Sequence, residues 1–276
     1  MRKIVDSNYL QSPKLREYLS ETRKNIAVVI DYAAMEALKG DTLASIFKSI
    51  EILAEFPDQV EVLKSTSIIC QLKGRRCGMT RRMIDKGQTT GFASWLHGLA
   101  RAKTGDEDLQ RQLLEAGKDA DAHMNRMLSD AQTYAKNLVE ASKHYAQAEL
   151  KILRKGEPIT EELFDKITKN ILEMAAFLFA AHPGIKELPP ASELPYTFIF
   201  RYAMCGYLLA LRWLSLGGFK DAKPERIRND IVDVTFSAYG THFQGVLSGD
   251  AMTNEIHDNA RALLKLFLAV PPPRLA

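Results

Sequence analysis

The chain has 276 residues, enough for one large domain or two small ones and for a sizeable buried core. Hydrophobic residues make up 46% and charged residues 26%, which is ordinary for a soluble globular protein. The net charge of +3 excludes a bulk polycation, so a nucleic acid would have to bind at a local basic patch. Three cysteines cannot all pair internally and lack zinc-site spacing, which favours a reducing cytoplasm.

The first residues predict a β-α-β unit. Lys3 to Asp6 is a short apolar run that ends on an acid, and Asn25 to Ile30 is a second run with the β-branched residues of a buried strand. Between them, Ser12 and Pro13 have the pattern of an N-cap followed by proline at the first helical position. We therefore expect a helix over residues 14–20.

The next stretch repeats this alternation. Asp31 to Lys39 is rich in helix formers and ends at Gly40, and residues 41–55 form a second amphipathic helical pattern that ends before Pro57. Gln59 to Leu63 then alternates as a short strand does. The pattern predicts a small parallel sheet.

From residue 65 to residue 218 the signals are almost only helical. Residues 107–154 predict one or two long polar helices, and a further helix is expected from Thr160 to His182. Three prolines mark residues 188–195 as a loop. The very apolar run over 197–215 contains Arg201 and Arg212, which favours a buried helix over a membrane span. The N-terminus has no apolar run of the kind that signal peptides carry.

The α/β character returns at the end of the chain. Pro224 opens a helix to about Tyr239, residues 243–247 predict a short strand, and a last helix follows Asp250 to about Leu268, before a disordered or extended tail. We predict an α/β fold, a small parallel sheet flanked by helices, helix-rich overall. Residues 1–64 and 219–276 would form its core, and 65–218 a mainly helical insertion.

Carboxylates stand where the predicted strands end. Asp6 ends the first strand, Glu36 lies early in the helix after the second, and Asp250 follows the last. Asp230 and Asp233 lie three residues apart on one face of a predicted helix. Ligands bind beyond the carboxyl ends of the strands in open α/β sheets, so these acids can converge there.

Converging carboxylates repel one another, and a hard cation such as Mg²⁺ or Mn²⁺ relieves the repulsion. Two such ions can activate water for phosphodiester hydrolysis. The other interpretation is that single acids after strands cap helices, and Asp31, Asp41 and Asp250 all stand at such positions.

These segments resemble the PIN domain nucleases. The chain begins with a strand and an aspartate (I-V-D-S-N), and a glutamate follows early in the helix after the second strand (V-V-I-D-Y-A-A-M-E). Near the end, N-D-I-V-D-V-T-F-S-A-Y-G-T-H-F-Q-G-V-L-S-G-D matches a helix with an aspartate and small residues, a strand, a hydroxyl residue and another aspartate. The matching positions are Asp6, Asn8, Glu36, Asp233, Ala238, Ser248 and Asp250.

The resemblance implies endonucleolytic cleavage of RNA, or less readily of single-stranded DNA, with divalent metal and water as the nucleophile. Asp6, Glu36, Asp233 and Asp250 would hold one or two Mg²⁺ or Mn²⁺ ions, and Asp230 would be a second ligand or face solvent. Asn8 and Ser248 would orient the ligands. PIN domains act as toxins, in RNA processing or in phage defence, and the helical insertion suggests a homodimer or a regulator protein as partner.

A basic stretch is the candidate for substrate binding. Residues 64–86 hold seven Lys or Arg and one acid, Asp85. Arg75, Arg76, Arg81 and Arg82 are suited to RNA phosphates, and a solvated surface loop is the other interpretation.

Other site types are disfavoured by the sequence. The six histidines form no zinc or ferritin-like pair, and there is no P-loop or dinucleotide motif. The aromatic run over 196–207 favours core packing rather than base stacking. The alternative to a nuclease is a mainly helical interaction subunit or an inactive relative, whose acids are caps and surface charges.

Overall fold

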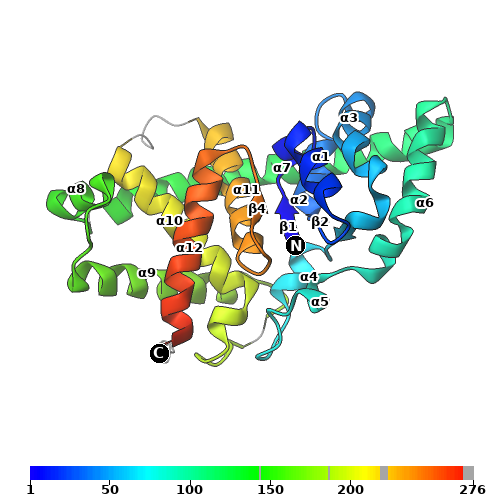
Figure 1. Ribbon diagram of the computed structural model, residues 1–276. Helices are drawn as coiled ribbons and strands as arrows, with labels where there is room; N and C mark the ends of the chain where they lie inside the picture. The colour runs from blue at the N-terminus through cyan, green and yellow to red at the C-terminus, as the bar shows by residue number, and fades with distance from the viewer. Residues whose placement is uncertain (143, 186, 218–222, 270–276) are drawn as a thin grey trace. The chain divides into compact units, whose positions relative to one another are not determined.

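Four short strands form one sheet in which every neighbouring pair is parallel, in the order β3-β2-β1-β4. The computed structural model of the protein describes residues 1–142, 144–185, 187–217 and 223–269. The strands, drawn as arrows in Figure 1, are β1 (Arg2–Val5), β2 (Ile26–Val29), β3 (Val60–Val62) and β4 (Val246–Leu247). This sheet with its flanking helices confirms the predicted fold class.

The strand sequences are apolar because a parallel sheet covered by helices is buried on both faces. Ile4, Val5, Ala27 and Val28 are almost completely covered, as expected for a parallel sheet with helices on its faces. The last strand is shorter than predicted, because Gly245 has a φ of 128° and ends a turn at that point. Only Val246 and Leu247 of the expected strand therefore pair with β1.

Helices connect the strands at positions that their caps define. The Ser12 and Asp41 side chains accept backbone N–H groups of the first turns of α1 and α3. The elements of this part are η1 (Ser7–Tyr9), α1 (Pro13–Glu21), α2 (Asp31–Ala37), α3 (Thr42–Glu55), η2 (Pro57–Gln59), α4 (Thr66–Cys70), α5 (Thr80–Met83) and α6 (Lys86–Lys103).

The remaining elements are helical apart from β4. They are α7 (Glu107–Ser142), α8 (Gln147–Lys155), α9 (Glu161–Ala181), η3 (Leu194–Tyr196), α10 (Phe198–Leu216), α11 (Pro224–Gly240) and α12 (Ala251–Ala269). As predicted, α10 is a core helix: Phe200, Ala203, Cys205 and Leu209 are fully covered, and α8, α9 and α11 pack against it. The predicted 107–154 stretch forms two helices, and the tail from residue 270 lies outside the described residues.

The chain divides into two compact units that alternate along the sequence. The first consists of Met1–Ile69, Met79–Arg126 and His242–Asn254, and holds the whole sheet. The second consists of Cys70–Gly78, Met127–Thr241 and the chain from Glu255 onward. Residues 79–126, assigned from the sequence to the insertion, thus group with the sheet, and α11 groups with the helical unit.

No helix within the described ranges is both long enough and apolar enough to span a membrane. This agrees with the assignment of α10, which carries Arg201, to the interior of the second unit. Burial lowers the pKa of Arg201 to about 10, and its guanidinium donates to the backbone oxygens of Pro195 (2.8 Å) and Thr241 (2.6 Å). These two bonds tie the loop before α10 to the end of α11.

Candidate active site at the carboxyl edge of the sheet

The strand order reverses between β1 and β4, and this is the place where open α/β sheets bind ligands. The register pairs Ile4 with Val246 and Val5 with Leu247, and the Asp6 N–H donates to the Leu247 carbonyl at 3.0 Å. The next residues along the two strands, Asp6 and Ser248, therefore meet at the carboxyl edge of the first unit. The sequence placed both there.

Asp6 is a fully buried carboxyl group held by hydroxyl and amide donors. The Ser248 hydroxyl donates to Asp6 Oδ2 at 2.5 Å, the Ser7 hydroxyl lies 3.3 Å from Oδ1, and the Asn8 backbone N–H is a third donor. Burial raises the pKa of Asp6 above its ordinary value; these donors partly offset the rise, and the charge of Asp250 adds to it. The surroundings of Asp6 thus disfavour its charged form relative to water.

Glu36 reaches the same place through Ser7. The Ser7 hydroxyl also donates to Glu36 Oε2, so a single hydroxyl lies between two carboxyl groups. A hydroxyl has one hydrogen and can donate to only one acceptor at a time, so Asp6 and Glu36 compete for it. The sequence reasoning named Glu36 but missed Ser7, whose only signal was its position directly after the strand-end acid.

Of the two roles that the sequence left open for Asp250, helix cap and metal ligand, the hydrogen bonds show the cap. Its Oδ1 accepts the Thr253 backbone N–H at 2.7 Å and the Thr253 hydroxyl at 3.1 Å, which makes it the cap of α12. Its own N–H donates to the Ser248 hydroxyl at 3.0 Å, in contact with the group that holds Asp6. Asp250 is therefore a helix cap that also adds negative charge beside Asp6.

A further acid stands on the same edge. Asp31 follows β2, but the cap position of α2 is Ile30, and the Asp31 carboxylate instead accepts the Thr66 N–H (2.6 Å) and hydroxyl (2.7 Å). Thr66 comes just after β3, so this pair joins the ends of two neighbouring strands. The sequence placed Asp31 among the candidate caps and gave no sign of its partner.

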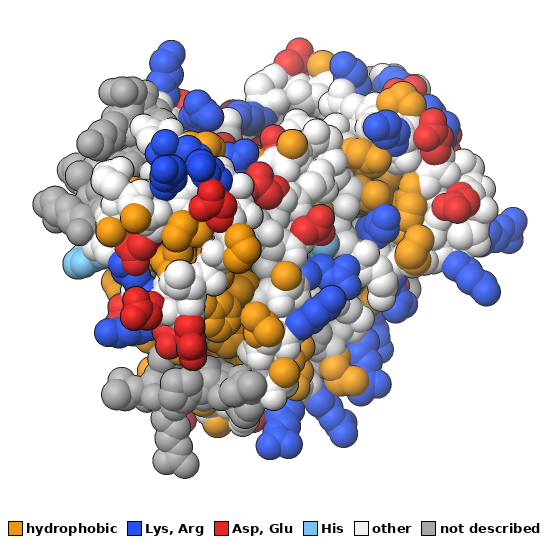
Figure 2. Space-filling model, turned by 60° about the vertical axis from the view of Figure 1, so that its left-hand side comes forward, with side chains coloured by type: hydrophobic (Ala, Val, Ile, Leu, Met, Phe, Trp, Pro, Cys, Tyr) orange, Lys and Arg blue, Asp and Glu red, His pale blue; other side chains and the backbone are white. Residues whose placement is uncertain are grey.

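The other predicted residues belong to different parts of the two units. Asp230 and Asp233 are half-buried on α11, in the second unit. Asn8 acts through its backbone, and its side chain is exposed. Arg75 and Arg76 belong to the second unit, whereas Arg81 and Arg82 lie in α5 of the first. On the face drawn in Figure 2, Lys and Arg side chains form several separate groups rather than one continuous patch.

The donor chemistry at this edge is oxygen only, which fits Mg²⁺ or Mn²⁺ rather than zinc. Asp6 and Glu36 are the two carboxylates that Ser7 joins, and Asp250 stands beside them as a cap. Across the residues that the structure describes, no three His, Cys, Asp or Glu side chains gather closely enough to hold a metal ion. In chemical type alone, the oxygen donors of Asp6 and Glu36 are those that a hard cation takes.

No family model, curated protein or solved structure matches the chain. The chemistry of the sheet edge is therefore the basis for assigning a function.

Proposed function

We propose that the chain is a metal-dependent endoribonuclease that hydrolyses RNA phosphodiester bonds at the carboxyl edge of its sheet. One observation carries the proposal: Asp6 is fully buried where the strand order reverses, and Ser7, Ser248 and Asp250 surround it. Burying a carboxyl group that lacks a positive partner is costly, so proteins rarely keep one without a use for its charge.

In this proposal the chain's own groups bind and orient. Asp6 and Glu36 would hold Mg²⁺ or Mn²⁺, with Asp250 adding negative charge. Ser7 and Ser248 fix the two oxygens of Asp6 through the bonds described above. Divalent metal, when bound, supplies an activated water and neutralises charge on the leaving oxygen.

The test is cleavage of labelled single-stranded RNA with Mn²⁺, with and without a chelator. Asp6→Asn keeps the size of the side chain but removes the charge, and we expect it to lower the cleavage rate at least about 100-fold, as loss of a group central to transition-state electrostatics does. Chelator should abolish cleavage by the unmodified protein. A gel assay of the labelled product gives the rates.

Asp58→Asn is the matched control, because Asp58 is an exposed acid of the same unit and the substitution is the same. It should cleave at the unmodified rate. If Asp6→Asn retains full activity, or if chelator has no effect, the nuclease proposal is wrong.

A second candidate function is a non-catalytic interaction protein or an inactive relative of the nucleases. The observation that favours it is the cap role of Asp250, together with the lack of a three-ligand group among the described residues. The same protein samples separate the two candidates. For a metal enzyme, millimolar Mn²⁺ should raise the melting temperature of the unmodified chain but not of Asp6→Asn. An unmodified chain that melts at the same temperature with and without metal would favour the interaction protein.

A further inference from the structure

The basic stretch contains a turn whose position is fixed by a buried residue. Gly74 has a φ of 83°, and the Cys77 N–H donates to its carbonyl at 2.8 Å, so Arg75 and Arg76 occupy the two central positions. Cys77 is almost completely buried, and it anchors the turn in the second unit. Both arginines are exposed, but the turn places them differently.

Arg75 lines a hollow of about 210 Å³, whereas Arg76 does not. The other lining residues are Ser192, Pro195, Tyr196, Phe267 and Leu268, all of the second unit. This volume suits one aromatic ring rather than a drug-sized ligand. Within the described part of the chain, Arg75 has no hydrogen bond or ion pair, so its guanidinium is available to an anion.

The aromatic residues of the hollow lie beside other ordered contacts. Phe267 packs edge-on against Phe200, with ring centres 5.1 Å apart. Tyr196 is half-buried, and both of its neighbours in the chain are held by hydrogen bonds. The Pro195 carbonyl accepts from Arg201, and the Thr197 hydroxyl caps α10. Sequence reasoning had favoured core packing for this aromatic run, and Tyr196 departs from it by lining an open hollow.

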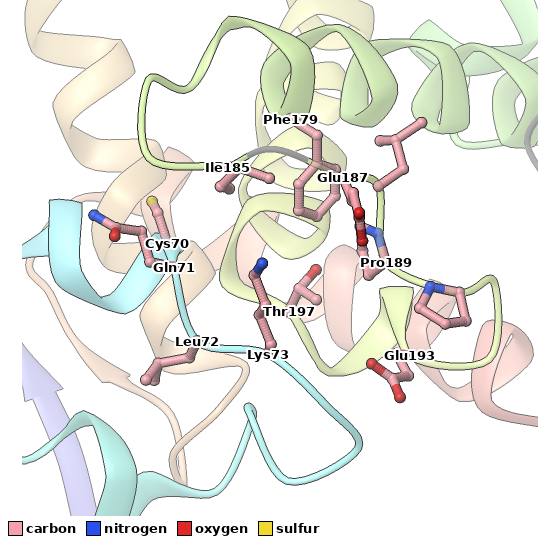
Figure 3. A pocket seen from close by; sticks show the side chains of 12 residues that line it. Cys70, Gln71, Leu72, Lys73, Phe179, Ile185, Glu187, Pro189, Glu193 and Thr197 are labelled. Atoms are coloured by element: carbon pink, nitrogen blue, oxygen red, sulfur yellow. The ribbon is translucent and has the colours of Figure 1, made fainter.

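Two other hollows of the second unit include acidic side chains among their lining residues. The one in Figure 3 includes Lys73 but also Glu187 and Glu193, which would repel a phosphate. A third, between α8, α10 and α12, includes Glu255, which pairs with Arg212 at 3.2 Å. The Arg75 hollow has no acid among its lining residues.

We propose that the Arg75 hollow is a nucleotide subsite for single-stranded RNA, an inference that rests on the proposed RNA substrate. Arg75 contacts a backbone phosphate, and the adjoining base stacks on Tyr196 above the apolar floor of Phe267 and Leu268. Arginine forks match phosphate oxygens, and aromatic rings take any base by its π-face. This combination binds single strands and disfavours duplexes, whose bases are already stacked.

The experiment measures binding of a short labelled RNA by fluorescence anisotropy, in chelator so that no cleavage occurs, at several salt concentrations. Arg75→Gln should weaken binding about tenfold, as loss of one charge-assisted hydrogen bond does. It should also lower the slope of log affinity against log salt by about 0.7, because one fewer phosphate is neutralised. Tyr196→Leu should weaken binding about tenfold and leave the slope unchanged, since stacking involves no charge.

Two matched variants make the test specific. Arg76→Gln removes the same charge from the same turn but lines no hollow, so it should weaken binding at most twofold. Tyr196→Phe keeps the ring and should bind as the unmodified protein does. Equal losses for Arg75→Gln and Arg76→Gln, or equal losses for the two Tyr196 variants, would overturn the subsite.

Failure of the subsite and failure of the proposed nuclease function can be distinguished by comparing RNA binding with RNA cleavage. RNA that binds through Arg75 and Tyr196 but is never cut in Mn²⁺ refutes the nuclease and leaves the subsite standing. RNA that is cut normally while both variants bind as the unmodified protein does refutes the subsite alone.

Discussion

Asp6 shows how one buried side chain links stability to chemistry. The folded chain raises the pKa of Asp6 above its ordinary value of 3.8, mainly through burial. The folded state therefore binds the Asp6 proton more tightly than the unfolded state does. Stability from this group is present at low pH and is lost as the pH rises through the window above the ordinary value.

We therefore predict that Asp6→Asn, in chelator, raises the melting temperature at neutral pH. Asparagine keeps the shape and can still bond the Ser7 and Ser248 hydroxyls, but it has no charge to bury. The gain should be a few degrees at pH 7 and should shrink toward zero as the pH falls below the ordinary value of 3.8, where the carboxyl group is protonated in both the folded and the unfolded chain. Scanning calorimetry across this pH range measures it.

Asp58→Asn again serves as the comparison, because Asp58 is exposed and its substitution should leave the melting curve nearly unchanged at every pH. A loss of stability in Asp6→Asn that is equal at all pH values would mean that the carboxylate is a structural acceptor, and would contradict the electrostatic account.

At the residue scale, the sequence predicted the acids better than their partners. Asp6, Asp250 and Ser248 are visible as residues that follow apolar runs, because parallel strands bring their ends to one edge. Ser7 and Thr66 are not, because their bonds to Glu36 and Asp31 exist only once helices and neighbouring strands have packed.

At the element scale, Gly117 marks a close approach of α7 to α3. A Cβ placed on Gly117 of α7 would lie 2.3 Å from the hydroxyl oxygen and 2.9 Å from the methyl carbon of Thr42, the first residue of α3. Two effects of Gly117→Ala oppose each other. Helix propensity favours alanine by about 1 kcal/mol, and overpacking costs about 1–3 kcal/mol.

We expect the clash to win, because Thr42 is buried and its short side chain has little room to turn away. Gly117→Ala should lower the free energy of unfolding by about 1–2 kcal/mol, measured by urea denaturation. Adding Thr42→Ala should restore most of the loss. Gly98→Ala on α6, where the new Cβ meets nothing within 4 Å, should instead be stabilising, and a loss there equal to that at Gly117 would disprove the contact.

Helix ends were the most predictable elements, because capping is local. Ser12, Thr160 and Thr197 each accept a backbone N–H at the start of the helix that the sequence assigned to them. The length of β4, the strand before Asp250, was less predictable, because it depends on how many of its residues pair with β1. The paired residues lie more than 200 residues apart in the chain.

At the scale of the whole molecule, the division into two units could not be predicted from the sequence, because segments of the two units alternate along the chain. The chain passes from the first unit to the second at residue 70, and α7 and α12 each run from the first unit into the second. β4, which completes the sheet, enters between α11 and α12. Each unit is therefore built from segments that lie apart in the chain, with segments of the other unit between them.

This interlacing predicts that the chain unfolds in one cooperative step, unlike a pair of domains joined by a linker. The two tryptophans allow a test, since Trp95 lies on α6 in the first unit and Trp213 on α10 in the second. Trp95 is 42% exposed, so Trp95→Phe is a mild change that leaves Trp213 as the fluorescent reporter of the second unit. In that background Gly117→Ala, a change in the first unit, should move the urea midpoint of Trp213 fluorescence by the same amount as that of far-ultraviolet circular dichroism. A Trp213 midpoint that stays fixed while the dichroism midpoint shifts would show that the two units unfold separately. The alternation of their segments along the chain would then not couple their unfolding.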